Sequence, residues 1–119
     1  AETALVDIFA ASRRAVRLPD IVGAVCHLFG LEPEQIHSPS RSPTVSHPRM
    51  LAMWLARKYT RSALSEISRF FSRKSHTTVL SAEETVKEWL ASGKSVALPQ
   101  GSCRVEEALR RVEVQLRLA

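Results

Sequence analysis

The 119-residue sequence contains no apolar run of the roughly 18 or more residues that a membrane-spanning helix needs. It has only two cysteines, Cys26 and Cys103, and neither belongs to a CxxC pair, which argues against both a zinc site and a secreted disulfide scaffold. No charged and then apolar leader opens the chain. These absences predict a soluble, cytoplasmic, single-core protein with two unpaired thiols, no bound metal and no membrane partner.

The residue patterns that catalysis requires are also missing. The four histidines share no ligand spacing such as HxxxH, and no grouping of Ser or Cys with His is recognisable. Gly93, Lys94 and Ser95 resemble the end of a phosphate-binding P-loop, but that motif needs a glycine where this chain has Glu88. We therefore expect neither an enzyme nor a bound cofactor.

What the sequence does have is basic charge concentrated in one stretch. The chain carries 17 Lys and Arg against 12 Asp and Glu, a net charge of +5. Residues 41–74 hold eight of the basic residues and a single acid, a local charge of +7, whereas the remaining segments together carry −2. Such a stretch can neutralise phosphates and release their counterions. The distribution favours a polyanionic partner.

The spacing of apolar residues predicts an all-α, compact helical bundle. Helices are expected over residues 1–17, 19–29, 62–72, 75–92 and 102–119, over a short turn at 33–36, and from a cap at Thr44 or Ser46 to Tyr59. Residues 38–43 contain two prolines and three serines and are predicted to be a basic loop, and residues 95–101 a linker. The expected organisation is an N-terminal helix or linker over 1–18, a helical domain over 19–93, and a linker with an amphipathic helix over 94–119.

Two neighbouring predicted helices have the proportions of a helix-turn-helix. A helix of about two turns, a tight basic turn and a longer helix follow one another between Ser62 and Leu90. The longer helix would be capped by Ser75 and begins with His76, Thr77 and Thr78, small or hydrogen-bonding residues that can meet base edges in the major groove. The alternative is an ordinary polar helix start. The adjoining basic residues favour the DNA-binding interpretation.

The run from Ile67 to Ser81, with a basic residue, a histidine, two hydroxyl residues and an aliphatic residue, resembles the signature of the C-terminal DNA-binding domain of the bacterial replication initiator DnaA. The upstream segment Arg41 to Val45, followed by Pro48-Arg49, resembles that family's basic loop and first signature helix. The resemblance covers roughly Pro19 to Trp89. It implies a fold of the Trp repressor and DnaA domain IV type, with 19–93 as the DNA-binding domain.

The resemblance also implies roles for individual residues. Arg41 would enter the minor groove, while His76 and Thr77 would contact bases in the adjacent major groove. The residues implied to hold phosphates are Arg49, Arg57, Lys74 and Thr78. The implied target is double-stranded DNA at the DnaA boxes of a replication origin, bound by a nucleoid-associated protein whose ATPase module lies elsewhere in a longer chain.

Several positions depart from the family pattern. Ser75 stands where the family usually has Asp, which can accept a hydrogen bond from a cytosine amino group, so the preference at that base is open.

Two other functions also stay open. One is a stand-alone or transposon-associated regulator, and the other is a protein-interaction module that docks a partner through its terminal helices and has only a nonspecific basic face.

Overall fold

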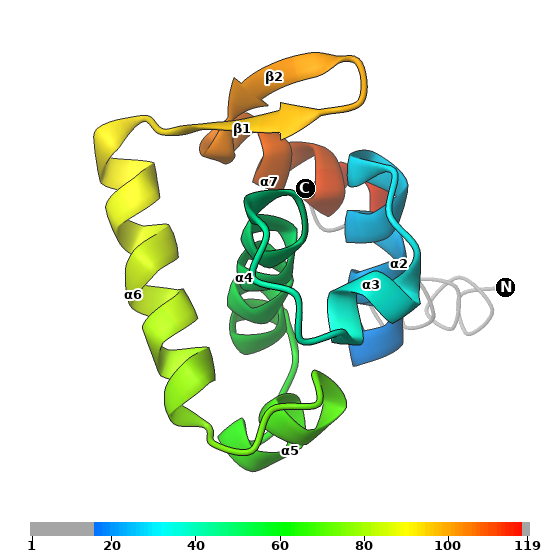
Figure 1. Ribbon diagram of the computed structural model, residues 1–119, viewed down its shortest axis with the longest axis vertical. Coiled ribbons are helices and arrows are strands. Elements are labelled where there is room, and N and C mark those ends of the chain that lie inside the picture. The colour runs from blue at the N-terminus through cyan, green and yellow to red at the C-terminus, as the bar shows by residue number, and fades with distance from the viewer. Residues whose placement is uncertain (1–15, 118–119) are drawn as a thin grey trace, which may run out of the picture.

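A computed structural model describes residues 16–117 of the chain as a bundle of helices with one small β-hairpin (Figure 1). The elements are α2 Leu18–Phe29, α3 Pro33–His37, α4 Pro43–Tyr59, α5 Leu64–Phe70, α6 Thr77–Ser92, β1 Ser95–Leu98, β2 Gly101–Arg104 and α7 Val105–Gln115. The helix predicted over residues 1–17 falls on residues outside this range, apart from its last two.

Helix α2 follows the predicted bounds because both of its ends carry strong local signals. Pro19 lies in its first turn, and the Asp20 carboxylate accepts a hydrogen bond from the Arg17 amide at 3.1 Å. Gly30 ends the helix with φ of 67°, a left-handed conformation that glycine adopts without a Cβ penalty. Ile21 and Val25 are fully buried on its inner face.

Helix α4 begins earlier than its prolines suggest. Its cap is Ser42 rather than Thr44 or Ser46, and Pro43 occupies the first turn, where a missing N–H costs nothing because no intrahelical acceptor is available there. Pro48 lies inside the helix and is buried. The basic loop is therefore shorter at its C-terminal end than residues 38–43 implied.

The segment predicted to be a linker, residues 95–101, is part of a β-hairpin, so the strictly all-α expectation is wrong. Strands β1 and β2 are antiparallel, with Val96 opposite Cys103 and Leu98 opposite Gly101. Each strand has four residues, too few for alternation to be visible in the sequence. The hairpin also moves the start of the last helix from Ser102 to Val105.

One hydrophobic core joins the hairpin and the last helix to the rest of the bundle. Helix α4 lies at its centre, with α6 on one side and α2 and α3 on the other (Figure 1). The predicted apolar face of α7 is confirmed, since Val105, Leu109 and Val112 are buried in the same core as Val96. Segment 94–117 thus packs as part of the bundle. No helix within residues 16–117 is long and apolar enough to cross a membrane.

Candidate nucleic-acid interface

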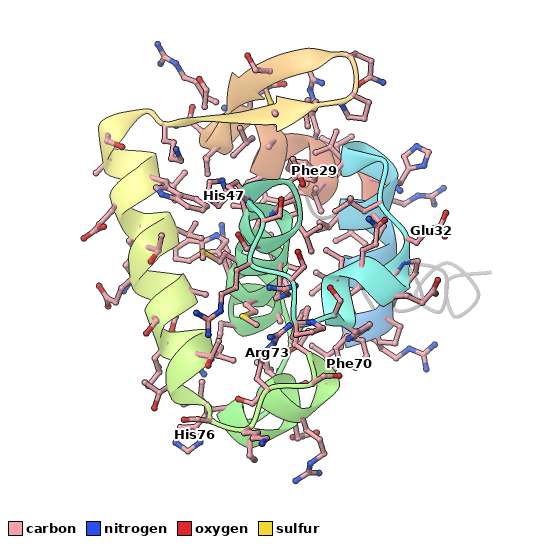
Figure 2. All side chains as sticks on the ribbon, in the orientation of Figure 1. Phe29, Glu32, His47, Phe70, Arg73 and His76 are labelled. Carbon is pink, nitrogen blue, oxygen red and sulfur yellow. The ribbon has the colours of Figure 1, made fainter. Side chains whose placement is uncertain are left out.

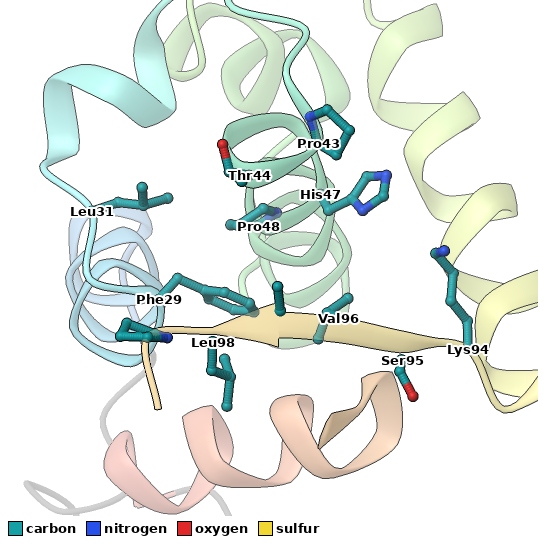
Figure 3. Close-up of a pocket in the computed structure, with 12 residues that line it drawn as sticks. Phe29, Leu31, Pro43, Thr44, His47, Pro48, Lys94, Ser95, Val96 and Leu98 are labelled. Atoms are coloured by element: carbon teal, nitrogen blue, oxygen red, sulfur yellow. The ribbon is translucent and has the colours of Figure 1, made fainter. Parts of the chain in front are cut away.

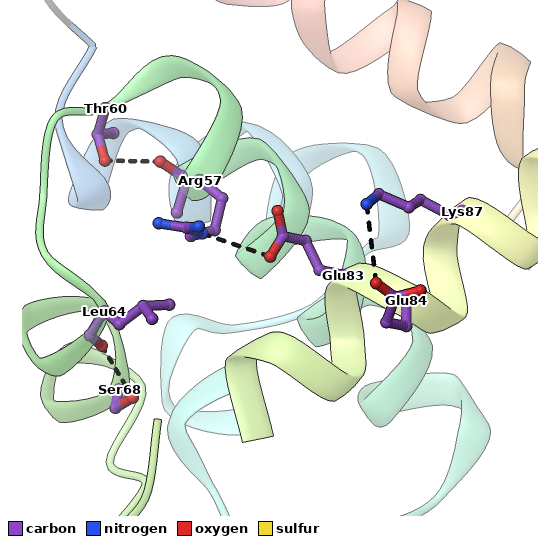
Figure 4. A network of polar contacts seen from close by, with 8 residues as sticks. Arg57, Thr60, Leu64, Ser68, Glu83, Glu84 and Lys87 are labelled. Carbon is purple, nitrogen blue, oxygen red and sulfur yellow. Dashed lines mark hydrogen bonds and ion pairs between the residues drawn. The ribbon is translucent and has the colours of Figure 1, made fainter. Parts of the chain in front are cut away.

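Helix α5 and the turn after it set the direction of α6. Ala63, not the predicted Ser62, is the N-cap of α5, and its amide donates to the Glu66 carboxylate at 3.0 Å. The buried Ser68 hydroxyl donates to the Leu64 carbonyl at 2.9 Å, which satisfies it inside the helix (Figure 4). Ser72 then adopts φ of 60°, in the left-handed region, and turns the chain towards α6.

The first turn of α6 presents polar side chains to solvent. The N-cap of α6 is His76, not the predicted Ser75. The Ser75 hydroxyl oxygen still accepts a hydrogen bond from the Thr77 amide at 3.1 Å, so it satisfies one of the free amides at the helix start. Val79 is fully buried, and the helix therefore turns His76, Thr77 and Thr78 outward. His76 lies at the end of the molecule where α5 meets α6 (Figure 2).

One exposed apolar residue in this region is not among the predicted DNA contacts. Leu80, one turn beyond Thr77, is 40% exposed, although leucines at helical spacing usually belong to the core. Its position could have been predicted, because it falls outside the apolar stripe of Val79, Ala82 and Val86. A leucine on this face can contact a thymine methyl group.

Two of the predicted basic contacts pair with no acidic residue within 16–117. Arg41 in the loop before α4 and Lys74 in the turn before α6 are both exposed. Among residues 16–117, neither side chain has a hydrogen-bond or ion-pair partner. Both cations are available for phosphates or a groove.

Arg49 differs from its predicted role, because it is 6% exposed and its guanidinium points into the protein. Nε donates to the Ile36 carbonyl at 2.7 Å, Nη1 to Ser40 at 2.9 Å and Nη2 to Ser38 at 2.8 Å. Burial, and then the charge of Arg73, lower the pKa of Arg49 to about 10. With its donors on backbone carbonyls, Arg49 holds the segment before α4 and is not placed to contact a phosphate.

Arg57 is more exposed than Arg49 but, unlike Arg41 and Lys74, pairs with an acidic residue. Its side chain is 35% exposed, and its Nε pairs with the Glu83 carboxylate of α6 at 3.4 Å (Figure 4). A pair at this exposure contributes less than about 1 kcal/mol, so a phosphate can compete for the guanidinium. The predicted phosphate contact of Arg57 can use its two Nη groups, because only Nε is paired with Glu83.

A cavity of about 330 Å³ lies away from the first turn of α6, beside the hairpin (Figure 3). Phe29, Val96 and Leu98 give it apolar walls, and His47 and Lys94 stand at its edge. His47 packs edge-on against Trp89, with ring centroids 4.7 Å apart, and burial together with the charge of Lys94 lowers its pKa. Within residues 16–117, no cluster of His, Cys, Asp and Glu could hold a metal ion.

The short helix α5, the turn at Ser72 and the outward-facing start of α6 define a helix-turn-helix domain. A family model of the bacterial DnaA protein helix-turn-helix matches residues 18–86. The chain belongs to this family, which confirms the resemblance carried by the loop and the signature run.

Relatives named chromosomal replication initiator protein DnaA are similar over most of this chain. That of Bacteroides thetaiotaomicron is 44% identical over 82 residues, or 69% of this chain and 17% of the relative. That of Thermus thermophilus is 41% identical over 96 residues, or 81% and 22%. That of Chromobacterium violaceum is 37% identical over 94 residues, or 79% and 20%. The chain thus spans about a fifth of the length of the curated relatives it matches.

Proposed function

We propose that this domain binds double-stranded DNA sequence-specifically at sites like the DnaA box and contributes to the initiation of chromosomal replication. The observation that carries the proposal is the exposed row of Ser75, His76, Thr77 and Thr78 at the start of α6, beside the exposed cation of Lys74, in a chain of the DnaA family. The domain itself is not an enzyme. We expect an ATPase module elsewhere in a longer parent chain, and a site of action at the nucleoid in the cytoplasm.

The start of α6 is suited to the major groove, which admits an α-helix. Thr77 and Thr78 offer methyl groups to thymine and hydroxyls to base or phosphate acceptors, and His76 can donate to purine N7 or O6. Arg41 extends from the loop before α4 and would enter the adjacent minor groove. Lys74 would hold a phosphate at the edge of the major groove.

The contact of Ser75 sharpens the open question at that base. Its hydroxyl oxygen already accepts from the Thr77 amide, which leaves the hydroxyl hydrogen as a free donor. An ionised aspartate at this position can only accept, for instance from a cytosine amino group, whereas the serine hydroxyl can also donate, to guanine O6 or N7 or to a phosphate. We expect the base preference opposite residue 75 to differ from that of relatives with Asp.

Binding to a DnaA-box duplex and to a scrambled duplex at two salt concentrations tests the proposal. We expect the box to bind more tightly, and Thr77→Ala or His76→Ala to remove about 1–3 kcal/mol of that preference, because each deletes a base contact. Thr85→Ala, the same change two turns along α6, is the matched control and should retain the preference. Equal affinities of the unchanged domain for the two duplexes would contradict the proposal.

The same measurement separates the proposal from a protein-interaction module with a nonspecific basic face. That alternative predicts DNA affinity without base preference. It is weakened by α7, whose apolar residues Val105, Ala108, Leu109 and Val112 are already buried against the bundle and cannot dock a partner without opening the core.

A further inference from the structure

The turn of the helix-turn-helix contains a second basic residue, Arg73, whose side chain does not extend into solvent like that of Lys74. Its Nε donates to the Phe71 carbonyl at 3.0 Å, and its Nη2 donates to the Ser38 carbonyl, 35 residues earlier in the chain. Figure 2 shows Arg73 reaching from the turn towards the loop that precedes α4. One guanidinium therefore joins the turn to the loop segment.

The Ser38 carbonyl accepts a second hydrogen bond from the buried Arg49, at 2.8 Å. Two like charges on one carbonyl repel each other, and the charge of Arg73 contributes to the lowered pKa of Arg49. Arg49 is held in place by its further bonds to Ile36 and Ser40. The loop is thus attached to α4 through Arg49 and to the turn through Arg73.

The attached segment is the one that carries Arg41. Ser38 and Ser40, whose carbonyls are bonded, lie within three residues of Arg41, and their hydroxyls accept from the Ser40 and Ser42 amides at 3.3 Å each. The loop is therefore folded on itself and fixed at its base, while the Arg41 side chain stays exposed. Moving Ser38 relative to the turn would move Arg41 relative to His76 and Thr77.

We infer that Arg73 is a positioning residue that sets the spacing between the minor-groove arginine, Arg41, and the base-contacting start of α6. The inference rests on the proposed function. Arg73 raises affinity through the loop and not through a phosphate, because its Nε and Nη2 are held on carbonyls of the protein, which fix the direction of the guanidinium. The partner selected in this way is a duplex whose A·T-rich minor groove lies at one fixed number of base pairs from the major-groove contacts.

An arginine is needed for this arrangement, because its planar guanidinium donates in two fixed directions at once. Nε faces Phe71 within the turn, and Nη2 faces Ser38 across the gap to the loop. A lysine would keep the charge at residue 73 but has no such fork. Arg73→Lys therefore separates the positioning role from a role of charge alone.

A double-mutant cycle tests the inference. Duplex affinities of the domain are measured for the unchanged chain, Arg73→Gln, Arg41→Ala and the double variant, on the box duplex and on a box with one base pair inserted between its A·T-rich end and the remainder. We expect Arg73→Gln to weaken binding to the box by about threefold to tenfold and to reduce the discrimination against the inserted duplex. In the Arg41→Ala background the same change should have no effect.

The salt dependence and the lysine variant supply readouts that a merely structural or phosphate-binding role would not give. Arg73→Gln should leave the salt slope unchanged, and Arg73→Lys should not rescue the affinity. Independent, multiplying effects of Arg73→Gln and Arg41→Ala would overturn the inference, as would rescue by lysine or a salt slope lowered by about one.

The thermal midpoint of each variant checks folding. If the unchanged domain failed to prefer the box over a scrambled duplex, the proposed function would fail as well. A retained preference with multiplying effects would refute only the role of Arg73.

Discussion

The two ends of α6 differ in what their side chains contact. At its start, Lys74, His76, Thr77 and Thr78 are exposed, and their side chains have no hydrogen-bond or ion-pair partner among residues 16–117. At its other end, Trp89 packs against His47 and lies under the ammonium group of Lys94, 5.8 Å from the ring centroid.

This difference separates residues that stabilise the domain from residues left free for a ligand. Gly93 closes the far end of the helix in a left-handed conformation, and the chain passes directly into the hairpin. The contacts at that end are intramolecular and are lost only on unfolding. At the start of α6, the hydrogen-bonding side chains are exposed. We expect changes at the two ends to have separable effects on stability and on DNA binding.

The largest effect is expected from Trp89→Ala. Trp89 is half-buried against the core and against His47, so its removal should lower the free energy of unfolding by about 2–3 kcal/mol, less than the roughly 3–5 kcal/mol typical of a fully buried aromatic residue. Urea unfolding measures the loss, and DNA affinity below the transition should be unchanged. A variant that kept its stability but lost box binding would reverse the assignment of the two ends.

A smaller effect is expected at the start of α6 from Lys74→Ala. Its ammonium is exposed and unpaired within the described part of the chain, so its removal should weaken all duplexes alike and lower the salt slope by about one. Arg110→Ala on α7 removes the same charge from a residue that pairs with Glu106 and Glu107, and should leave the slope unchanged. Equal salt slopes for Lys74→Ala and Arg110→Ala would mean that the DNA does not bind at the start of α6.

The smallest effect concerns the pH dependence of stability at the far end of α6. Burial and the charge of Lys94 lower the pKa of His47 from its usual 6.5, so the unfolded chain binds a proton more readily than the folded one. The stability that neutral His47 contributes is fully present above pH 6.5. It is lost as the pH falls towards the lower pKa that His47 has in the folded domain. His47→Phe, which keeps the contact with Trp89, should flatten the decline in stability between pH 7 and 5, measured by urea unfolding. If the pH profile of stability were the same in His47→Phe as in the unchanged domain, His47 would not be the source of the decline.

The exposed face at the start of α6 could be predicted because its signals are local. The apolar spacing of Val79, Ala82 and Val86 determines which face of α6 is buried, and the outward direction of His76 and Thr77 follows from it. The roles of Arg49 and Arg73 could not be predicted in this way. Nothing in the order of residues distinguishes an arginine bonded to a carbonyl 11 or 35 residues away from one that faces solvent.

By itself the sequence determined the helices with strong ends, the buried stripe of α6, the concentration of basic charge and the membership of the DnaA family. These depend on neighbours within a few residues or on motif spacing. Only the tertiary structure decided that residues 95–104 pair as a hairpin and which arginines remain free, because both depend on groups brought together from distant segments. The sequence and the tertiary structure agree on the exposed residues that follow Ser75.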